Sequence, residues 1–281
     1  MQKTIVYIIS DQRSGSTLLE QVLSCSYNVN TVGELIHLHD YLKQSGVGWP
    51  RGWQCQCGEP VNTCQFWSDI MCYADLDIRT MLPTKLTNNI GRHEENREKN
   101  ERINQLDIIY DALFEKLNCS VLIDSSKNVY QAIELSKYSR HHYRFIYLTR
   151  DMRAVTLSKR KWRKIYGQEI PPLLRNLAAV LRKRIKYNNA VEVLGPNHIT
   201  IQYEKLVKNY PEYLRLIWDF VANEWVNVVV PDTVGGSKGH TIAGTPNRNK
   251  VRGIVYDDTW RRKSKERKFF NLIGYMLELI V

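Results

Sequence analysis

The sequence predicts an α/β protein in which a parallel β-sheet carries helices on both faces. Two apolar runs, Ile5 to Ile9 and Phe145 to Leu148, have the composition of strands buried on both faces, and each leads into a segment with helical spacing. The chain has 281 residues, of which 43% are apolar, enough for a full core. We therefore expect a single domain over residues 1–281, with a substrate lid or insert at about 45–100.

The remaining elements follow from the same patterns. The first strand ends in a polar turn with Gly15, and a helix begins at Ser16 because Leu18, Leu19, Val22 and Leu23 have helical spacing. Residues 45–66 are rich in Gly, Trp, Pro and Cys and have no clear period, so we expect a long loop over the functional site. The further elements expected, in chain order, are a short strand (30–33), a helix (34–42), a charged surface helix or loop (92–102), a helix (103–117), a strand (121–123), a helix (131–137), a basic helix (171–194), a strand (199–203), a helix (211–221) and a final helix (264–279).

The first strand, turn and helix form a candidate phosphate site. Backbone N–H groups at a glycine turn and a helix N-terminus point to one spot, and the helix dipole adds positive potential there. Compared with the P-loop pattern G-x-x-x-x-G-K-[ST], Ser10 and Gly15 take the glycine positions, Ser16 the lysine and Thr17 the hydroxyl. The lysine that reaches the terminal phosphates is missing, and the cation inside the turn is Arg13. The loop therefore fits an anion other than a nucleoside triphosphate better.

A second strand–helix junction carries residue types that suit a phosphate. Arg150 ends the strand of residues 145–148, and Ser158 follows eight residues later on the next helix. A guanidinium offers two parallel donors to a phosphate, and a hydroxyl adds a third. Two strand–helix junctions of this kind in one chain are a more specific signal than either junction alone.

Both junctions resemble those of sulfotransferases that use 3′-phosphoadenosine 5′-phosphosulfate (PAPS), and the match is to bacterial members of that family. Arg-Ser-Gly-Ser-Thr-Leu-Leu resembles their 5′-phosphosulfate loop, and Arg150 with Ser158 resembles their 3′-phosphate clamp. Tyr203, in Gln-Tyr-Glu-Lys-Leu, resembles a tyrosine beside the adenine, and Arg248, with His240 and Asn247 nearby, resembles a segment folding over the cofactor. The resemblance implies a three-layer sandwich of the P-loop NTPase type and PAPS as co-substrate, bound by Arg13, Ser14, Gly15, Ser16, Thr17, Leu18, Arg150, Ser158, Tyr203 and Arg248.

Sulfuryl transfer needs a base for the acceptor and cations for the leaving phosphate, and we expect positioning and electrostatics to carry most of the rate. Glu34, in Val-Gly-Glu-Leu, resembles the glutamate of tyrosylprotein sulfotransferases and is the candidate base, with a pKa raised by a partly dry cleft. A plain helix-start glutamate is the alternative. His37 and His39 are competing bases, although neither has the lysine-x-histidine setting of cytosolic sulfotransferases. The resemblance makes Arg13 and Lys127 the charge stabilisers, and no metal is then required.

The net charge of +11 is concentrated near the second junction. Residues 140–186 contain 14 Lys and Arg against Asp151 and Glu169, a local excess of +12. No nucleic-acid-binding motif accompanies this charge, so we expect no nucleic-acid partner. Part of the run 159–164 is interpreted as a solvated face or an acceptor-binding surface.

The four cysteines Cys55, Cys57, Cys64 and Cys72 lie in one loop region, at spacings that differ from the usual C-x-x-C zinc pattern. Free thiols are favoured, while zinc binding and a disulfide stay open. The stretch resembles one in some bacterial sulfotransferases, which does not give it a role. The chain shows no signal peptide and no apolar run long enough to span a membrane, so a cytoplasmic location is expected.

Two other function classes stay open. Val-Leu-Ile-Asp124 resembles a Walker B strand and supports an ATP-dependent small-molecule kinase, although the missing P-loop lysine opposes it. A non-catalytic, basic polyanion-binding protein is the other alternative. For a sulfotransferase, the acceptor (a small molecule, carbohydrate, lipid or peptide, attacked at a hydroxyl or amine) and the oligomeric state do not follow from the sequence.

Overall fold

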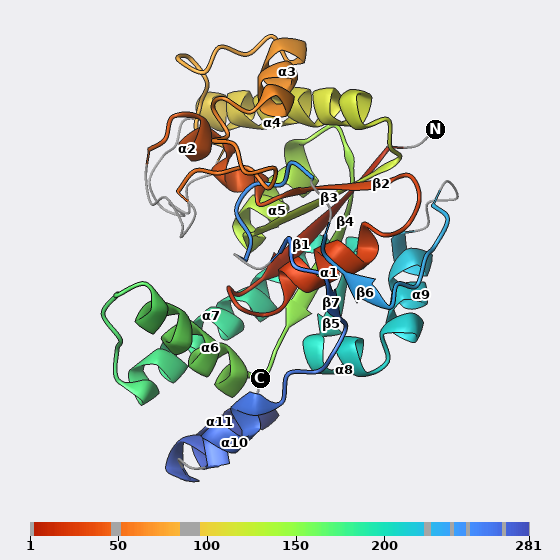
Figure 1. The fold of residues 1–281 in the computed structure, drawn as a ribbon. Helices are drawn as coiled ribbons and strands as arrows, with labels where there is room; N and C mark the ends of the chain where they lie inside the picture. Colours follow the sequence, from red (N-terminus) through yellow and green to blue (C-terminus); the bar gives the residue numbers. More distant parts are fainter. Residues whose placement is uncertain are drawn as a thin grey trace.

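A five-stranded parallel sheet forms the centre of the molecule in the computed structural model, which describes residues 3–45, 52–84, 96–221, 226–236, 239–245, 248–265 and 268–280 (Figure 1). The strand order is β2-β3-β1-β4-β5, and every neighbouring pair is parallel. The predicted α/β fold class is confirmed. The strands are β1 (Thr4–Ser10), β2 (Val29–Gly33), β3 (Val121–Lys127), β4 (His142–Thr149) and β5 (His198–Gln202).

Helices cover both faces of the sheet, as the alternation along β1 requires. Ile5, Tyr7 and Ile9 point into one fully buried cluster, and Val6 and Ile8 into another on the opposite face. The first face carries η1 (Leu35–His37), α2 (Leu38–Leu42), α3 (Gln65–Tyr73), α4 (Asn96–Leu117), α5 (Val129–Tyr138), part of α7 (Leu173–Val191) and η2 (Glu192–Asn197), and the second carries α1 (Ser16–Leu23), α8 (Tyr203–Lys208) and α9 (Tyr210–Val221).

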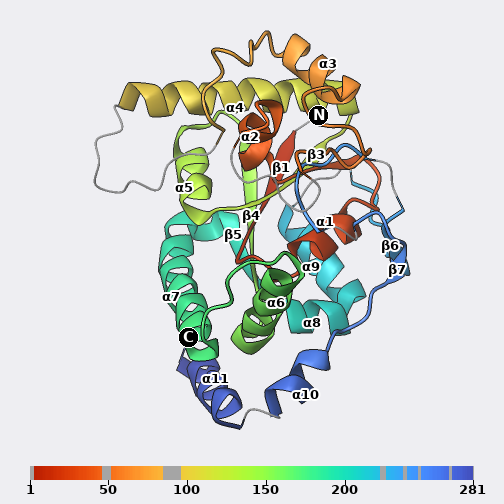
Figure 2. The same ribbon diagram turned by 60° about the vertical axis from the view of Figure 1, so that its left-hand side comes forward.

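The last two helices extend the molecule at one end. α11 (Lys268–Ile280) packs on α6 (Met152–Ile165) and α7, with α10 (Thr259–Lys265) next to α6 (Figure 2). The sequence predicted one helix there, from 264 to 279, where the structure has two. Among the described residues, no helix combines the length and apolarity needed to cross a bilayer.

Helices α3 and α8 were not predicted. In α3 only Trp67 and Ile70 are buried, so its apolar stripe is too short to give a helical period. Helix α4 begins at Asn96 and so includes part of the charged run, which is helical from that point, while residues 92–95 lie outside the described residues. Tertiary packing, rather than local pattern, decides that these segments are helical.

The C-terminal strap, residues 239–245 and 248–257, returns to the sheet beside β2. The N–H of Ile242 donates to the carbonyl of Val32 (3.0 Å), and the N–H of Glu34 donates to the carbonyl of Ile242 (3.0 Å). A two-stranded sheet of β6 (Thr233–Val234) and β7 (Arg252–Gly253) joins the strap to the segment before it. The strap therefore lies beside the end of β2 and contacts Glu34, the residue that follows this strand. Asn247 lies outside the described residues.

The cysteine-rich segment packs on this strap. The N–H of Gln56 donates to the carbonyl of Thr241 (3.1 Å), and the side chains of the same two residues are hydrogen-bonded (2.8 Å). No residue of 52–84 lines either of the two large clefts described below. Residues 52–84 therefore support the strap. The lid expected at about 45–100 stays a prediction, and residues 46–51 and 85–95 of that range lie outside the described residues.

Candidate active site

A cleft of about 530 Å³ opens at the carboxyl edge of the sheet. Because parallel strands present their carboxyl ends at one edge, the residues after β1, β2, β3 and β4 meet there. The cleft brings together most of the residues that the sequence predicted for the site: Arg13, Gly15, Ser16, Thr17, Leu18, Glu34, Lys127, Arg150 and Tyr203.

Three other predicted residues lie elsewhere. Ser158 lines an adjoining cleft of about 440 Å³, which shares Arg13 and Arg150 with the first. Ser14 is buried and faces a small cavity behind the loop. The Arg248 side chain is buried in the strap, where its guanidinium donates to the carbonyl of Ala243. Ser14 and Arg248 therefore support the walls of the cleft in this structure and do not line it.

The first loop has the geometry of an anion site. Gly15 is the N-cap of α1 with φ +99°, and its carbonyl accepts from the N–H of Leu18 (2.9 Å) and of Leu19 (3.1 Å). Ser16 and Thr17 are the first two residues of α1, so their backbone N–H groups have no acceptor within the helix. These N–H groups are available to a ligand in the cleft. Arg13 also has a positive φ (+71°), although it is not a glycine, and the chain turns sharply there before the helix begins.

Replacing Gly15 by alanine is expected to lower the free energy of unfolding by more than about 2 kcal/mol. A Cβ there would lie 2.4 Å from Cδ2 of Tyr203, in addition to the strain of the positive φ. Gly167→Ala is the matched control, since Gly167 also has a positive φ (+61°) but no atom within 4 Å of the added Cβ. Chemical denaturation of both variants measures the difference. Equal losses would show that the contact with Tyr203 has no part in it.

The two predicted phosphate sites touch each other. Arg13 Nε donates to Ser158 Oγ (3.1 Å), and Arg150 Nη1 donates to the carbonyl of Arg13 (3.1 Å). The Arg150 guanidinium also lies 4.4 Å from the centre of the Tyr203 ring. A fixed guanidinium, an aromatic face and the loop therefore meet within the span of one nucleotide.

Glu34 and Lys127 form an ion pair in the cleft. Lys127 Nζ contacts Glu34 Oε1, which also accepts from the N–H of Gly244 (3.1 Å), and His37 Nε2 lies 3.8 Å from Glu34 Oε2. Lys127 is the last residue of β3 and has a positive φ of +68°, so the extended backbone of the strand ends there. His37 and His39, the competing bases, do not line the cleft.

The direction expected for the Glu34 pKa is wrong. Burial pushes the pKa of Glu34 upward, but the charges of Lys127 and His37 and the hydrogen bonds from Lys127 and Gly244 outweigh burial and hold it below its usual value. The carboxylate is therefore ionised at neutral pH and can accept a proton or a hydrogen bond.

Helix α6 supplies cleft residues that were predicted only as part of a charged run. Lys159, Trp162 and Arg163 have i, i+3, i+4 spacing, so they share the face of α6 that lines the cleft. Arg13 lies over the Trp162 ring at 4.9 Å. The helical spacing within 159–164 was a usable signal, whereas Arg252 and Asp257, from the strap, had none.

Asp124, the Walker B candidate, faces the core. Its carboxylate accepts from the Tyr110 hydroxyl (2.6 Å) and the Ser126 N–H (2.8 Å), and it lines neither cleft. Burial raises the pKa of Asp124 to about 6. A metal-binding carboxylate beside the loop would have to reach the cleft, so the resemblance to Walker B is confined to sequence.

Comparisons with a family model and with solved structures both find sulfotransferases. The family model described as "Sulfotransferase family" matches residues 6–227. The sulfotransferase domain of the Synechococcus PCC 7002 olefin synthase has a similar structure, with a TM-score of 0.57, 20% identity and coverage of 92% of this chain and 88% of that one. The sulfotransferase domain of the curacin biosynthetic pathway gives a TM-score of 0.55 and 19% identity over 94% of this chain and 90% of that one. A search of curated protein sequences found no match.

Proposed function

The chain belongs to the sulfotransferase family, and we propose that it transfers the sulfuryl group of PAPS to a hydroxyl or amine acceptor and releases 3′,5′-ADP (PAP). One observation carries the choice of donor: Arg150 and Ser158 lie against Arg13 of the first loop. A nucleotide with phosphate groups on both its 5′ and 3′ sides needs two anion sites this close together. An ordinary adenine nucleotide needs one.

Each end of the donor has candidate ligands. The amides of Ser16 and Thr17 and the side chain of Arg13 would hold the 5′-phosphosulfate. Arg150 and Ser158 would hold the 3′-phosphate, with the adenosine beside Tyr203. The walls of the two clefts carry an excess of basic side chains, which suits a ligand with several negative charges.

Catalysis then rests on the ion pair at the end of β3. Glu34 would take the proton from the attacking acceptor, and Lys127 and Arg13 would neutralise the charge that builds up on the bridging and sulfuryl oxygens. The chemistry needs positioned cations rather than a metal ion, and these cations line the cleft.

The acceptor has room on the side formed by α6 and α7. Gln168, Asn176 and Ala179 line the cleft there, and Asn176 Nδ2 is buried with no partner among the described residues. The space beside these residues is where an acceptor would lie.

A thermal-shift experiment tests the donor. PAP at about 100 times its Kd is expected to stabilise the protein by about 2.7 kcal/mol, which raises the Tm of a domain this size by roughly 5 °C. 5′-AMP at the same concentration is expected to give a much smaller shift, because it leaves Arg150 and Ser158 without a phosphate.

The same experiment separates the alternatives. A kinase would respond to Mg-ATP and not to PAP, and a polyanion-binding protein would respond to heparin equally in the native chain and in Thr17→Val. Transfer of label from [35S]PAPS to an acceptor pool is the direct assay. Equal shifts with PAP and 5′-AMP would contradict PAPS as the donor.

A further inference from the structure

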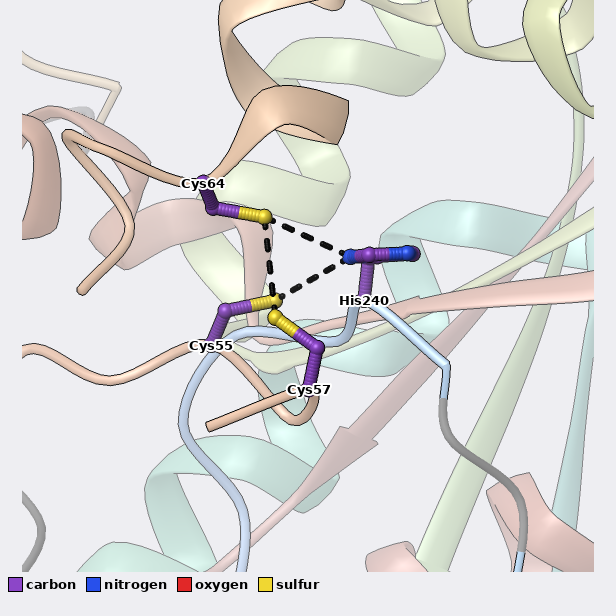
Figure 3. Close-up of side chains that lie close together, drawn as sticks. All are labelled: Cys55, Cys57, Cys64 and His240. Carbon is purple, nitrogen blue, oxygen red and sulfur yellow. Dashed lines mark hydrogen bonds between the residues drawn. The ribbon is translucent and has the colours of Figure 1, made fainter. Parts of the chain in front are cut away.

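Three thiols and one imidazole converge outside the proposed active site (Figure 3). Cys55, Cys57 and Cys64 come from the cysteine-rich segment and His240 from the strap. Their ligand atoms all lie within 4.8 Å of one another. His240 Nδ1 is 3.6 Å from Cys55 Sγ and 3.4 Å from Cys64 Sγ, and Cys57 Sγ is 3.7 Å from Cys64 Sγ.

The three shortest of these distances, 3.4, 3.6 and 3.7 Å, match the edges of a zinc tetrahedron. With Zn–S bonds of about 2.3 Å and a Zn–N bond of about 2.0–2.1 Å, S···S edges are about 3.8 Å and S···N edges about 3.6 Å. Soft thiolate ligands with one imidazole select zinc among the common divalent ions. We propose that Cys55, Cys57, Cys64 and His240 bind one Zn²⁺ ion.

The backbone around the cysteines is shaped for such a site. The N–H of Cys55 donates to the carbonyl of Glu59 (2.8 Å), and the N–H of Gly58 donates to the carbonyl of Cys55 (3.0 Å), which closes a turn with Gly58 at φ +106°. Cys64 is the N-cap of α3, so the start of that helix fixes the position of its sulfur, 3.4 Å from His240 Nδ1.

The imidazole is held from two sides. Its ring stacks on Phe66 with centroids 4.5 Å apart and planes inclined by 10°, and the Trp67 indole N–H donates to the His240 carbonyl (3.1 Å). Both aromatic residues belong to α3, the helix that Cys64 caps. His240 Nδ1 is therefore kept facing the thiols, as a metal ligand requires.

Four protein ligands leave no open position, so the ion is structural rather than catalytic. None of the four lines either large cleft. The site instead joins the cysteine-rich segment to the strap, close to where the N–H of Gly244 donates to Glu34 Oε1. Zinc would thereby fix the strap that forms one wall of the cleft.

Metal analysis of the native chain, purified under reducing conditions from zinc-supplemented medium, is the first test. We expect about one zinc per chain. Cobalt titration of the zinc-free chain is expected to give the intense visible bands of tetrahedral, thiolate-bound Co²⁺. Cys64→Ser and His240→Ala are expected to lower zinc affinity by at least about tenfold.

Cys72→Ser is the matched control, because Cys72 is an exposed thiol on α3 outside the cluster. It is expected to retain the full zinc content. The native-chain measurements stand even if a ligand variant fails to fold. The proposal is overturned if the native chain binds neither zinc nor tetrahedral cobalt, if mass spectrometry finds a Cys57–Cys64 disulfide in the freshly purified chain, or if Cys72→Ser loses as much zinc as Cys64→Ser.

Discussion

Glu34→Gln is expected to lower kcat for sulfuryl transfer by about 10²–10⁴-fold, the usual contribution of a general base. The amide keeps the size of the side chain and can still accept from Gly244, but it cannot take a proton from the acceptor. Steady-state assays measure the effect, with PAPS and any acceptor that the native chain sulfonates. Glu59→Gln is the matched control, since Glu59 is an exposed glutamate outside the clefts and should leave kcat unchanged.

A pH profile and a double variant test Glu34 as the base. Because the Lys127 and His37 charges keep the pKa of Glu34 low, the carboxylate stays ionised as the pH falls to the ordinary glutamate value of about 4.3. The acid limb of kcat/KM is therefore expected below about 4.3. Recovery of activity in the double variant Glu34→Gln/Lys127→Met would contradict a role for Glu34 in proton transfer.

Arg150→Lys is expected to raise the Kd for PAP by about 100-fold, because a lysine keeps the charge but loses the two parallel donors of the guanidinium. The Kd for 5′-AMP is expected to change by less than about threefold, since that ligand lacks the 3′-phosphate. Isothermal titration with both ligands measures the ratio. Ser158→Ala should raise the ratio of the PAP Kd to the 5′-AMP Kd by about tenfold, because one hydrogen bond to the 3′-phosphate is lost.

Arg175→Lys is the matched control, because Arg175 is an exposed arginine at the start of α7 that lines neither cleft. It should change neither Kd. Arg150 also donates to the carbonyl of Arg13, so the substitution could act by disturbing the first loop. Equal loss of PAP and 5′-AMP affinity would indicate that second role and contradict a specific 3′-phosphate contact.

Much of the fold follows from local patterns. The buried runs at 5–9 and 145–148 became β1 and β4, because a segment that is apolar on both faces can be satisfied only inside a sheet covered on both sides. The short helices α3 and α8 did not follow, since their burial depends on neighbours that are remote in sequence. Family membership was likewise readable, because each anion-site motif is continuous in the chain.

Motifs contained in one strand–turn–helix unit, such as the first loop with its Gly15 turn, were determined by the sequence itself, since a few neighbouring residues fix their backbone. Only the tertiary structure decided which residues from distant segments of the chain lie side by side. It paired Glu34 with Lys127, which reverses the pKa shift expected from burial, and brought His240 to Cys64 and Cys55, which lie 176 and 185 residues away in the chain. Electrostatics and metal geometry depend on distances between atoms, and spacing along the chain does not determine these for segments joined only by the fold.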